Sequence, residues 1–170
     1  MHSNNLNQTT MGKKLLIACL LFTGLIACKS KKSAFDYSQN VVAKERSLEK
    51  YITETEDKVE RYADKEQFDS IAIAGEKMEK MIQDKIDEIN AMDVPKAKEA
   101  DNFKAAIMKY FNYMKSIYTG YKNVGRAAST EERTTLVMDL QKLVGKKQAA
   151  ISDMQTAQKK YAQANGFKLE

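Results

Sequence analysis

The residue of this chain with the clearest chemistry is Cys28, a thiol at the end of an apolar run. Lys13 and Lys14 precede the run and give it a positively charged start. The run covers residues 15–26, about 12 residues, which is too short for a membrane-spanning helix of roughly 20 residues. A small residue, Ala27, lies directly before the cysteine, as a signal peptidase requires. The pattern predicts a secretory leader that is cleaved just before Cys28.

Leu25, Ala27 and Cys28 resemble the lipobox of bacterial lipoproteins, Leu-x-Ala-Cys. The resemblance implies that residues 1–27 are removed as a signal peptide. It also implies that the thiol then carries a diacylglycerol and the new amino group a further acyl chain such as palmitate. Met11 is a candidate for the true start, because the residues before it are polar and have no targeting role. The alternative is an uncleaved signal-anchor helix in which the cysteine is incidental.

The rest of the chain lacks the residue types that most enzymes and metal sites use. The single histidine, His2, and the second cysteine, Cys19, both lie in the predicted leader. The mature chain would therefore have no disulfide, no thiolate nucleophile and no imidazole base or ligand. Its carboxylates mostly alternate with lysines, as on a solvated helix face, and the Glu-x-x-His motif of di-metal bundles is missing. We expect no enzymatic activity, no cofactor and no metal.

The positive charge of the chain is concentrated around the predicted cleavage site. The chain has 28 basic and 23 acidic residues, a formal charge of +5. Five lysines lie in the leader or just after Cys28, and every acidic residue follows them, so the remainder is neutral. We expect no nucleic-acid partner, because such binding needs a basic surface on the folded domain. Lys29, Lys31 and Lys32 are placed to meet anionic lipid head groups beside the acylated cysteine.

Apolar residues recur at alternating steps of three and four in four stretches, which is typical of helices that pack along a seam. No hairpin signal competes with this pattern. Four amphipathic helices joined by short connections predict an all-α fold, an up-down-up-down antiparallel four-helix bundle. We assign residues 1–27 to the signal peptide, 28–33 to the lipidated cysteine and a basic tether, and 34–170 to the bundle. The predicted seam residues are Val41, Glu45, Leu48, Ile52, Thr55, Val59 and Tyr62; Phe68, Ile71, Gly75, Met78, Ile82, Lys85, Ile89 and Met92; Phe103, Ile107, Tyr110, Met114, Ile117, Tyr121 and Val124; and Leu136, Leu140, Leu143, Lys147, Ala150, Met154, Ala157 and Tyr161.

Each predicted helix has residues that are typical of helix boundaries. Ser129 with Glu132 has the form of a capping box, in which each residue satisfies a backbone amide of the first turn. The predicted starts are at Ser33, Asp64, Pro95 and Ser129, and the predicted glycine endings are at Gly125 and Gly166.

The first two seams contain one acidic and one basic residue, Glu45 and Lys85. If the chain turns near Asp64, positions whose numbers sum to about 130 face each other across the pair of helices. We therefore expect Glu45 and Lys85 to meet in an ion pair that fixes the register.

Three aromatic residues, Phe111, Tyr113 and Tyr118, fall partly off the third seam. Two interpretations remain open for them. They either pack against the flank of a neighbouring helix or form an exposed aromatic surface that binds a partner, since aromatic residues are common in binding hot spots.

These observations favour a non-enzymatic, lipid-anchored binding or structural module that acts through its helical surface on an unidentified protein partner. The chain resembles small helical lipoproteins of Gram-negative bacteria that have no assigned activity. In that group Asp after the cysteine retains the protein in the inner membrane, so Lys29 implies the outer membrane, and the lysine-rich run favours its periplasmic leaflet over the cell surface. The alternative is a bundle that holds a small hydrophobic or aromatic ligand, for which a gap near Gly75 would be the sign.

Overall fold

The computed structural model describes residues 29–169, which form five α-helices and no strand. The helices are α1 (Lys29–Ala63), α2 (Phe68–Asn90), α3 (Ala100–Arg126), α4 (Thr130–Val144) and α5 (Lys147–Ala164). The predicted all-α class is confirmed for these residues, which pack as a helical bundle.

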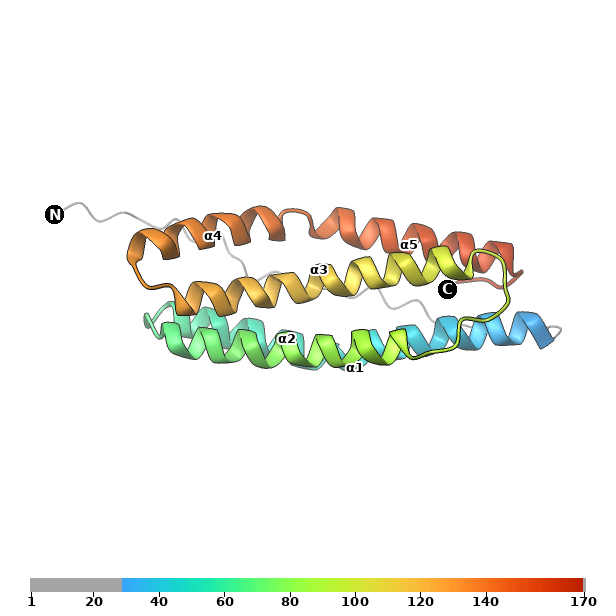
Figure 1. Cartoon of the computed structure of the whole chain (residues 1–170), viewed down its shortest axis with the longest axis horizontal. Helices are drawn as coiled ribbons and strands as arrows, with labels where there is room; N and C mark the ends of the chain where they lie inside the picture. Colours follow the sequence, from blue (N-terminus) through green and yellow to red (C-terminus); the bar gives the residue numbers. More distant parts are fainter. Residues whose placement is uncertain (1–28, 170) are drawn as a thin grey trace.

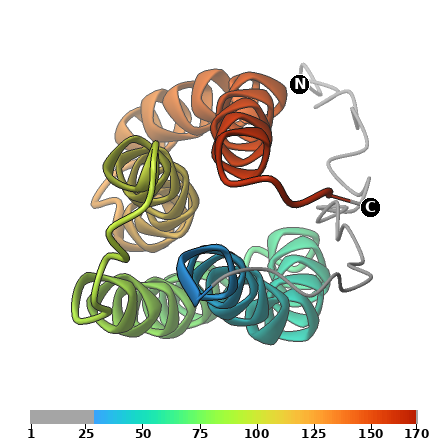
Figure 2. The same ribbon diagram turned by 90° about the vertical axis from the view of Figure 1, so that its right-hand side faces the viewer.

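The helices lie side by side along the long axis of the molecule (Figure 1). Residues 64–67, between α1 and α2, and residues 127–129, between α3 and α4, lie at one end, which we call the far end. Residues 91–99 lie at the other end together with the first turns of α1 and the last turns of α5, and we call this the near end. Seen end-on, α2 lies between α1 and α3, and α5 lies next to α3 (Figure 2).

The core is built mainly from the predicted seams of the first three helices. All seven predicted seam residues of α3 are buried, together with Phe111 and Tyr118 from its flank. In α2 the prediction is wrong at Lys85, because Ile86 is buried in its place. The buried stripe of α2 departs from the predicted seam at this turn and returns to it at Ile89, which is buried as predicted.

The predicted ion pair between Glu45 and Lys85 is wrong. Lys85 donates to Glu88 at 2.6 Å, and Glu88 also accepts from Lys44 of α1 at 2.6 Å. Glu45 is buried and lies against the Tyr110 hydroxyl of α3. Helix α1 thus directs Glu45 across the core towards α3, and the polar link between α1 and α2 is the Lys44–Glu88 pair.

Helices α2 and α3 approach each other closely at two glycines. A Cβ atom on Gly75 would lie 2.7 Å from the backbone nitrogen of Lys122, and one on Gly125 would lie 2.5 Å from that of Ala72. The seam residue Gly75 thus allows direct backbone contact between the two helices. Gly125 was predicted to end a helix but lies inside α3, where the contact with α2 explains it. Glu79 of α2 also forms an ion pair with Lys122.

The predicted fourth helix is two helices, α4 and α5, separated at Gly145 and Lys146. Glycine is a poor helix former, and one glycine in a continuous apolar pattern did not suffice to predict the break. The stripe is also less buried than predicted, because only Leu140 of α4 and Tyr161 of its predicted α5 positions are buried. The half-buried remainder of this stripe includes Leu136, Val137, Leu143, Val144, Ala150, Ile151 and Met154.

Two predicted helix boundaries are confirmed. The Ser129 side chain accepts from the backbone nitrogen of Glu132 at 3.1 Å, and the Glu132 carboxylate accepts from the backbone nitrogen of Ala128 at 2.7 Å. Gly166 has a φ of 72°, and the backbone nitrogen of the next residue, Phe167, donates back to the last turn of α5 at 3.1 Å. The start at Ser129 and the ending at Gly166 are therefore as predicted, although the Glu132 carboxylate binds the amide of Ala128 instead of that of Ser129.

Three predicted helix starts are wrong. Ser33 lies inside α1, Asp64 lies in the turn before α2, and Pro95 lies in the loop before α3. Helices α2 and α3 begin only after Glu66 and Glu99, which adopt left-handed backbone conformations with φ of 54° and 61°. Such conformations are uncommon for glutamate, so no residue pattern marked these turns.

Candidate functional site

The predicted lipidation site, Cys28, lies outside the described residues. Helix α1 begins at Lys29, the residue covalently linked to Cys28, so the attachment point is at the near end of the bundle. Among residues 29–169, no helix is long and apolar enough to cross a membrane. Acylation of Cys28 remains a prediction.

The predicted partner-binding residues do not form an exposed surface. Phe111 and Tyr118 are only 1% and 2% exposed, and both belong to the core. Tyr113 is half-buried, and its hydroxyl donates to the backbone oxygen of Leu143 in α4 at 3.1 Å. The exposed-surface interpretation is therefore wrong, and the packing interpretation describes these residues. Tyr113 thus packs against α4, whereas the Tyr118 hydroxyl lies close to Glu56 of α1.

The gap that would have indicated an internal ligand near Gly75 is filled. Besides the nitrogen of Lys122, the backbone oxygen of Tyr118 lies 2.8 Å from the position of a Cβ atom on Gly75. This part of the core is occupied by the backbone of α3.

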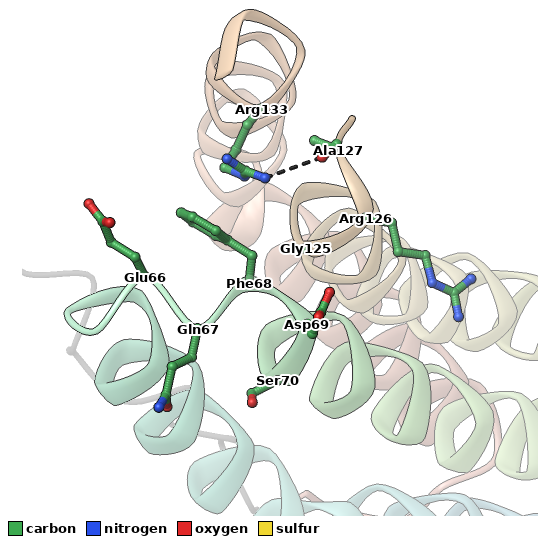
Figure 3. Close-up of a pocket in the computed structure, with 9 residues that line it drawn as sticks. All are labelled: Glu66, Gln67, Phe68, Asp69, Ser70, Gly125, Arg126, Ala127 and Arg133. Carbon is green, nitrogen blue, oxygen red and sulfur yellow. Dashed lines mark hydrogen bonds between the residues drawn. The ribbon is translucent and has the colours of Figure 1, made fainter. Parts of the chain in front are cut away.

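An open pocket of about 470 Å³ lies at the far end of the bundle (Figure 3). It is formed where the turn between α1 and α2 meets the end of α3 and the first turn of α4. Three segments that are distant in the sequence contribute to it, so only the folded chain assembles it. Its lining residues are Glu66, Gln67, Phe68, Asp69, Ser70, Gly125, Arg126, Ala127 and Arg133.

Arg133 and Phe68 make specific contacts in the pocket. The Arg133 guanidinium lies 3.6 Å from the centre of the Phe68 ring, a cation–π contact. The same guanidinium donates to the backbone oxygen of Val124 at 3.3 Å. It also donates to the backbone oxygen of Ala127 at 3.2 Å, the bond drawn in Figure 3. These bonds satisfy the last carbonyls of α3, which have no partner within the helix. Arg133 therefore fixes the end of α3 against α2 and α4.

The rim of the pocket has mixed charge. Arg126 extends away from the Phe68 ring in Figure 3 and pairs with Glu76 of α2 at 2.7 Å. The carboxylates of Glu66 and Asp69 belong to exposed residues. A polar rim around an aromatic ring can bind a polar protein segment through hydrogen bonds and stacking, which is the chemistry common in protein interfaces.

A row of acidic and tyrosine side chains crosses the interior between α1 and α3. Burial raises the pKa of the Glu45 carboxyl to about 7, although the Tyr110 hydroxyl acts in the opposite direction. Three helical turns further along α1, burial also raises the pKa of Glu56, and Lys147 at the start of α5 opposes that shift. The Tyr118 hydroxyl is buried close to Glu56 without a hydrogen bond of regular geometry, and burial raises its pKa.

The sequence did not predict either the far-end pocket or the interior row. Glu45 was placed on a seam but given the wrong partner, and Glu56 was interpreted as part of a solvated face. The heptad pattern carried a usable signal for Glu45, because a charged residue on a seam needs a polar partner. Among residues 29–169, no group of three or more His, Cys, Asp or Glu side chains is placed to hold a metal ion.

Comparison with known proteins gave no match to a family model, to a curated protein or to a solved structure.

Proposed function

We propose that this protein is a bacterial lipoprotein that is acylated at Cys28 and acts as a non-enzymatic binding or structural module. The lipobox resemblance supports the acylation. The helical bundle with an open pocket supports a binding module, because the pocket offers hydrogen-bonding groups around an aromatic ring.

The observation that carries the proposal is that the pocket and Lys29, the residue after the proposed acylation site, lie at opposite ends of the bundle. Helix α1 begins at Lys29, next to the acylated residue, and runs to the turn beside the pocket. Its 35 residues span about 50 Å at 1.5 Å per residue. An acyl anchor at the near end would therefore leave the pocket at the opposite end from the attachment point, where a protein partner can reach it.

The architecture we propose is the up-down-up-down antiparallel four-helix bundle, with α4 and α5 together as its fourth member. The alternation of the connecting loops between the two ends supports this topology. The location we propose is the periplasmic leaflet of the outer membrane, which Lys29 after Cys28 and the following lysines favour.

Acylation is tested by replacing the cysteine. In bacteria supplied with labelled palmitate, the native chain should incorporate the label and shorten, while Cys28→Ala should remain an unlabelled precursor. Equal incorporation into the two chains would contradict the anchor assignment.

Binding at the far end is tested with a photo-crosslinking amino acid in intact cells. Gln67 lines the pocket, and Gln163 is an equally exposed residue near the other end of the bundle. We expect a discrete crosslinked species from position 67 that is not formed from position 163. The same species from both positions, or from neither, would contradict the far-end pocket as the binding surface.

A further inference from the structure

The two ends of the bundle carry opposite excess charge. At the near end, the segments 31–36, 91–101 and 159–169 contain seven lysines and four acidic residues. At the far end, the segments 60–69 and 123–134 contain six acidic and four basic residues. The seven lysines, which we call the near-end lysines, are Lys31, Lys32, Lys96, Lys98, Lys159, Lys160 and Lys168.

Tertiary contacts bring these three near-end segments together. The Asn165 side chain donates to the backbone oxygen of Lys98 at 2.8 Å, which joins the end of α5 to the loop before α3. The rings of Phe35 and Phe167 lie 5.8 Å apart and join the start of α1 to the same place. The basic surface is therefore a product of the fold, assembled from segments that are far apart in the sequence (Figures 1 and 2).

The near-end lysines are not neutralised by acidic partners within the described chain. All seven are exposed, and none lies within 4.0 Å of a carboxylate among residues 29–169. Along the sides of the bundle, by contrast, cations such as Lys44 and Lys122 are paired with glutamates of a neighbouring helix. At the far end, Arg126 is paired with Glu76. The end next to Cys28 thus carries a net positive charge, whereas the far end carries a net negative charge.

We propose that the near-end lysines form a docking surface for anionic phospholipid head groups and hold the long axis of the bundle upright on the membrane. The proposal rests on the proposed anchor at Cys28 for its location, but the docking surface is a separate feature. Basic residues close to an anionic surface are attracted to it over roughly a Debye length, about 8 Å at physiological salt. Because the lysines come from three segments that meet at the near end, attraction is strongest when that end lies on the membrane. The excess acidic charge of the far end opposes a flat orientation.

The orientation can be measured on the acylated full-length chain purified from membranes. The leader cysteine is removed with residues 1–27 and Cys28 is acylated, so an introduced cysteine is the only free thiol. Gln163→Cys places a donor fluorophore at the near end, and Ala128→Cys places one at the far end, both at exposed positions. Helix α3, which runs between the two ends, is about 40 Å long.

Energy transfer to acceptor-labelled lipid head groups then reports the height of each probe. In vesicles of phosphatidylethanolamine and phosphatidylglycerol, we expect transfer from position 163 to exceed transfer from position 128 by about threefold or more, since the probes differ in height by about 40 Å. In phosphatidylcholine vesicles, or in about 1 M salt where the Debye length is about 3 Å, transfer from position 128 should rise, because a bundle held only by the acyl chains at its near end can tilt towards the membrane. Transfer from position 128 that is the same in all three conditions would contradict the proposal. Equal transfer from both probes in the anionic vesicles would overturn the proposal.

A charge-reversal variant and a matched control assign the effect to the near-end lysines. Lys96→Glu, Lys98→Glu and Lys159→Glu together should raise transfer from position 128 in anionic vesicles to the level seen in phosphatidylcholine. The control reverses Lys58, Arg61 and Lys65, three exposed cations near the far end, and should leave the orientation unchanged. An effect of the control as large as that of the near-end variant would contradict the proposal.

Circular dichroism of each variant checks that the bundle is intact, and the mass of each sample shows whether it is acylated. A missing acyl group would contradict the proposed function. For such a chain, preferential sedimentation with anionic over phosphatidylcholine vesicles would still support the docking surface, and equal sedimentation would overturn it.

Discussion

The pair formed by α2 and α3 and the pair formed by α4 and α5 are packed in different ways, although both derive from regular apolar seams. In the first pair, glycines bring two backbones into direct contact, and every predicted seam residue of α3 is buried. In the second, the chain breaks at Gly145 and most of the apolar stripe is only half-buried.

This difference in packing indicates which helices form the rigid part of the bundle. Helix α3 is covered by α2 on one side and by α4 and α5 on another, whereas α5 meets α1 mainly near the near end. There the Tyr161 hydroxyl donates to the backbone oxygen of Ala34 at 3.2 Å, and Phe167 lies against the Phe35 ring. We infer that α2 and α3 form the scaffold and that α4 and α5 are held against it more weakly.

The largest expected effect is at the close contact between α2 and α3. Gly125→Ala would place a Cβ atom 2.5 Å from the backbone atoms of Phe68 and Ala72, so the two helices must separate. We expect the free energy of unfolding to fall by about 3 kcal/mol or more, despite the higher helix propensity of alanine. Chemical denaturation with circular dichroism measures this loss. A change smaller than about 1 kcal/mol would show that the two helices are not tightly packed.

The buried acid of α1 should make the stability depend on pH. Burial raises the Glu45 pKa from 4.5 to about 7, so the folded state holds this proton more tightly than the unfolded chain does. The resulting stabilisation is complete below about pH 4.5 and is lost as the pH rises through about 7. Glu45→Gln keeps a neutral side chain beside Tyr110, so we expect this variant to be more stable than the native chain at pH 8 by about 2 kcal/mol.

The comparison that checks the Glu45 effect is between denaturation at pH 4.5 and at pH 8. The advantage of Glu45→Gln should be present only at the higher pH. Glu54→Gln, which changes an exposed carboxylate on the same helix, should give no comparable gain. The assignment to Glu45 is wrong if the two variants show the same pH dependence.

A smaller effect is expected where α5 meets α1. Tyr161→Phe keeps the ring that stacks on Phe103 but removes the hydrogen bond to Ala34. We expect a loss of about 1 kcal/mol, the usual net value of one buried hydrogen bond. Tyr51→Phe removes a hydroxyl from an exposed tyrosine of α1 and should be neutral. Thermal unfolding of the two variants side by side measures the difference. Equal melting temperatures would show that this hydrogen bond does not stabilise the fold.

The smallest effect, and one of opposite sign, is expected at the break between α4 and α5. Gly145 has helical dihedral angles, and a Cβ atom there would lie no closer than 3.4 Å to its neighbours. Gly145→Ala should therefore stabilise the chain by about 0.5 kcal/mol through helix propensity, in contrast to Gly125→Ala. The same denaturation experiment tests both glycines. Destabilisation by Gly145→Ala would show that the break is a packed part of the fold.

The sequence predicted the helical class and most of the core, because apolar spacing reports which face of a helix is buried. The predictions failed for residues whose contacts depend on the position of a third helix. Glu45 was paired with Lys85 because only two helices were compared, whereas its partner, Tyr110, comes from α3. Phe111 and Tyr118 were ambiguous for the same reason, since their burial depends on how other helices pack against α3.

The predictions of helix ends also succeeded where the interactions are local and failed where the conformation depends on tertiary packing. Ser129 and Gly166 were predicted correctly because their capping interactions are local. The turns at Glu66 and Glu99 require left-handed glutamates, which tertiary packing imposes against the local preference. The far-end pocket has no local signal, because Phe68, Gly125 and Arg133 meet only in the folded chain.

The intact mass of the natural protein, extracted from membranes without any substitution, tests the central claim most directly. We expect a chain that begins at Cys28 and has a diacylglycerol on the Cys28 thiol and one further acyl group on its amino nitrogen. A mass that corresponds to an unmodified chain beginning at Met1 or Met11 would contradict it.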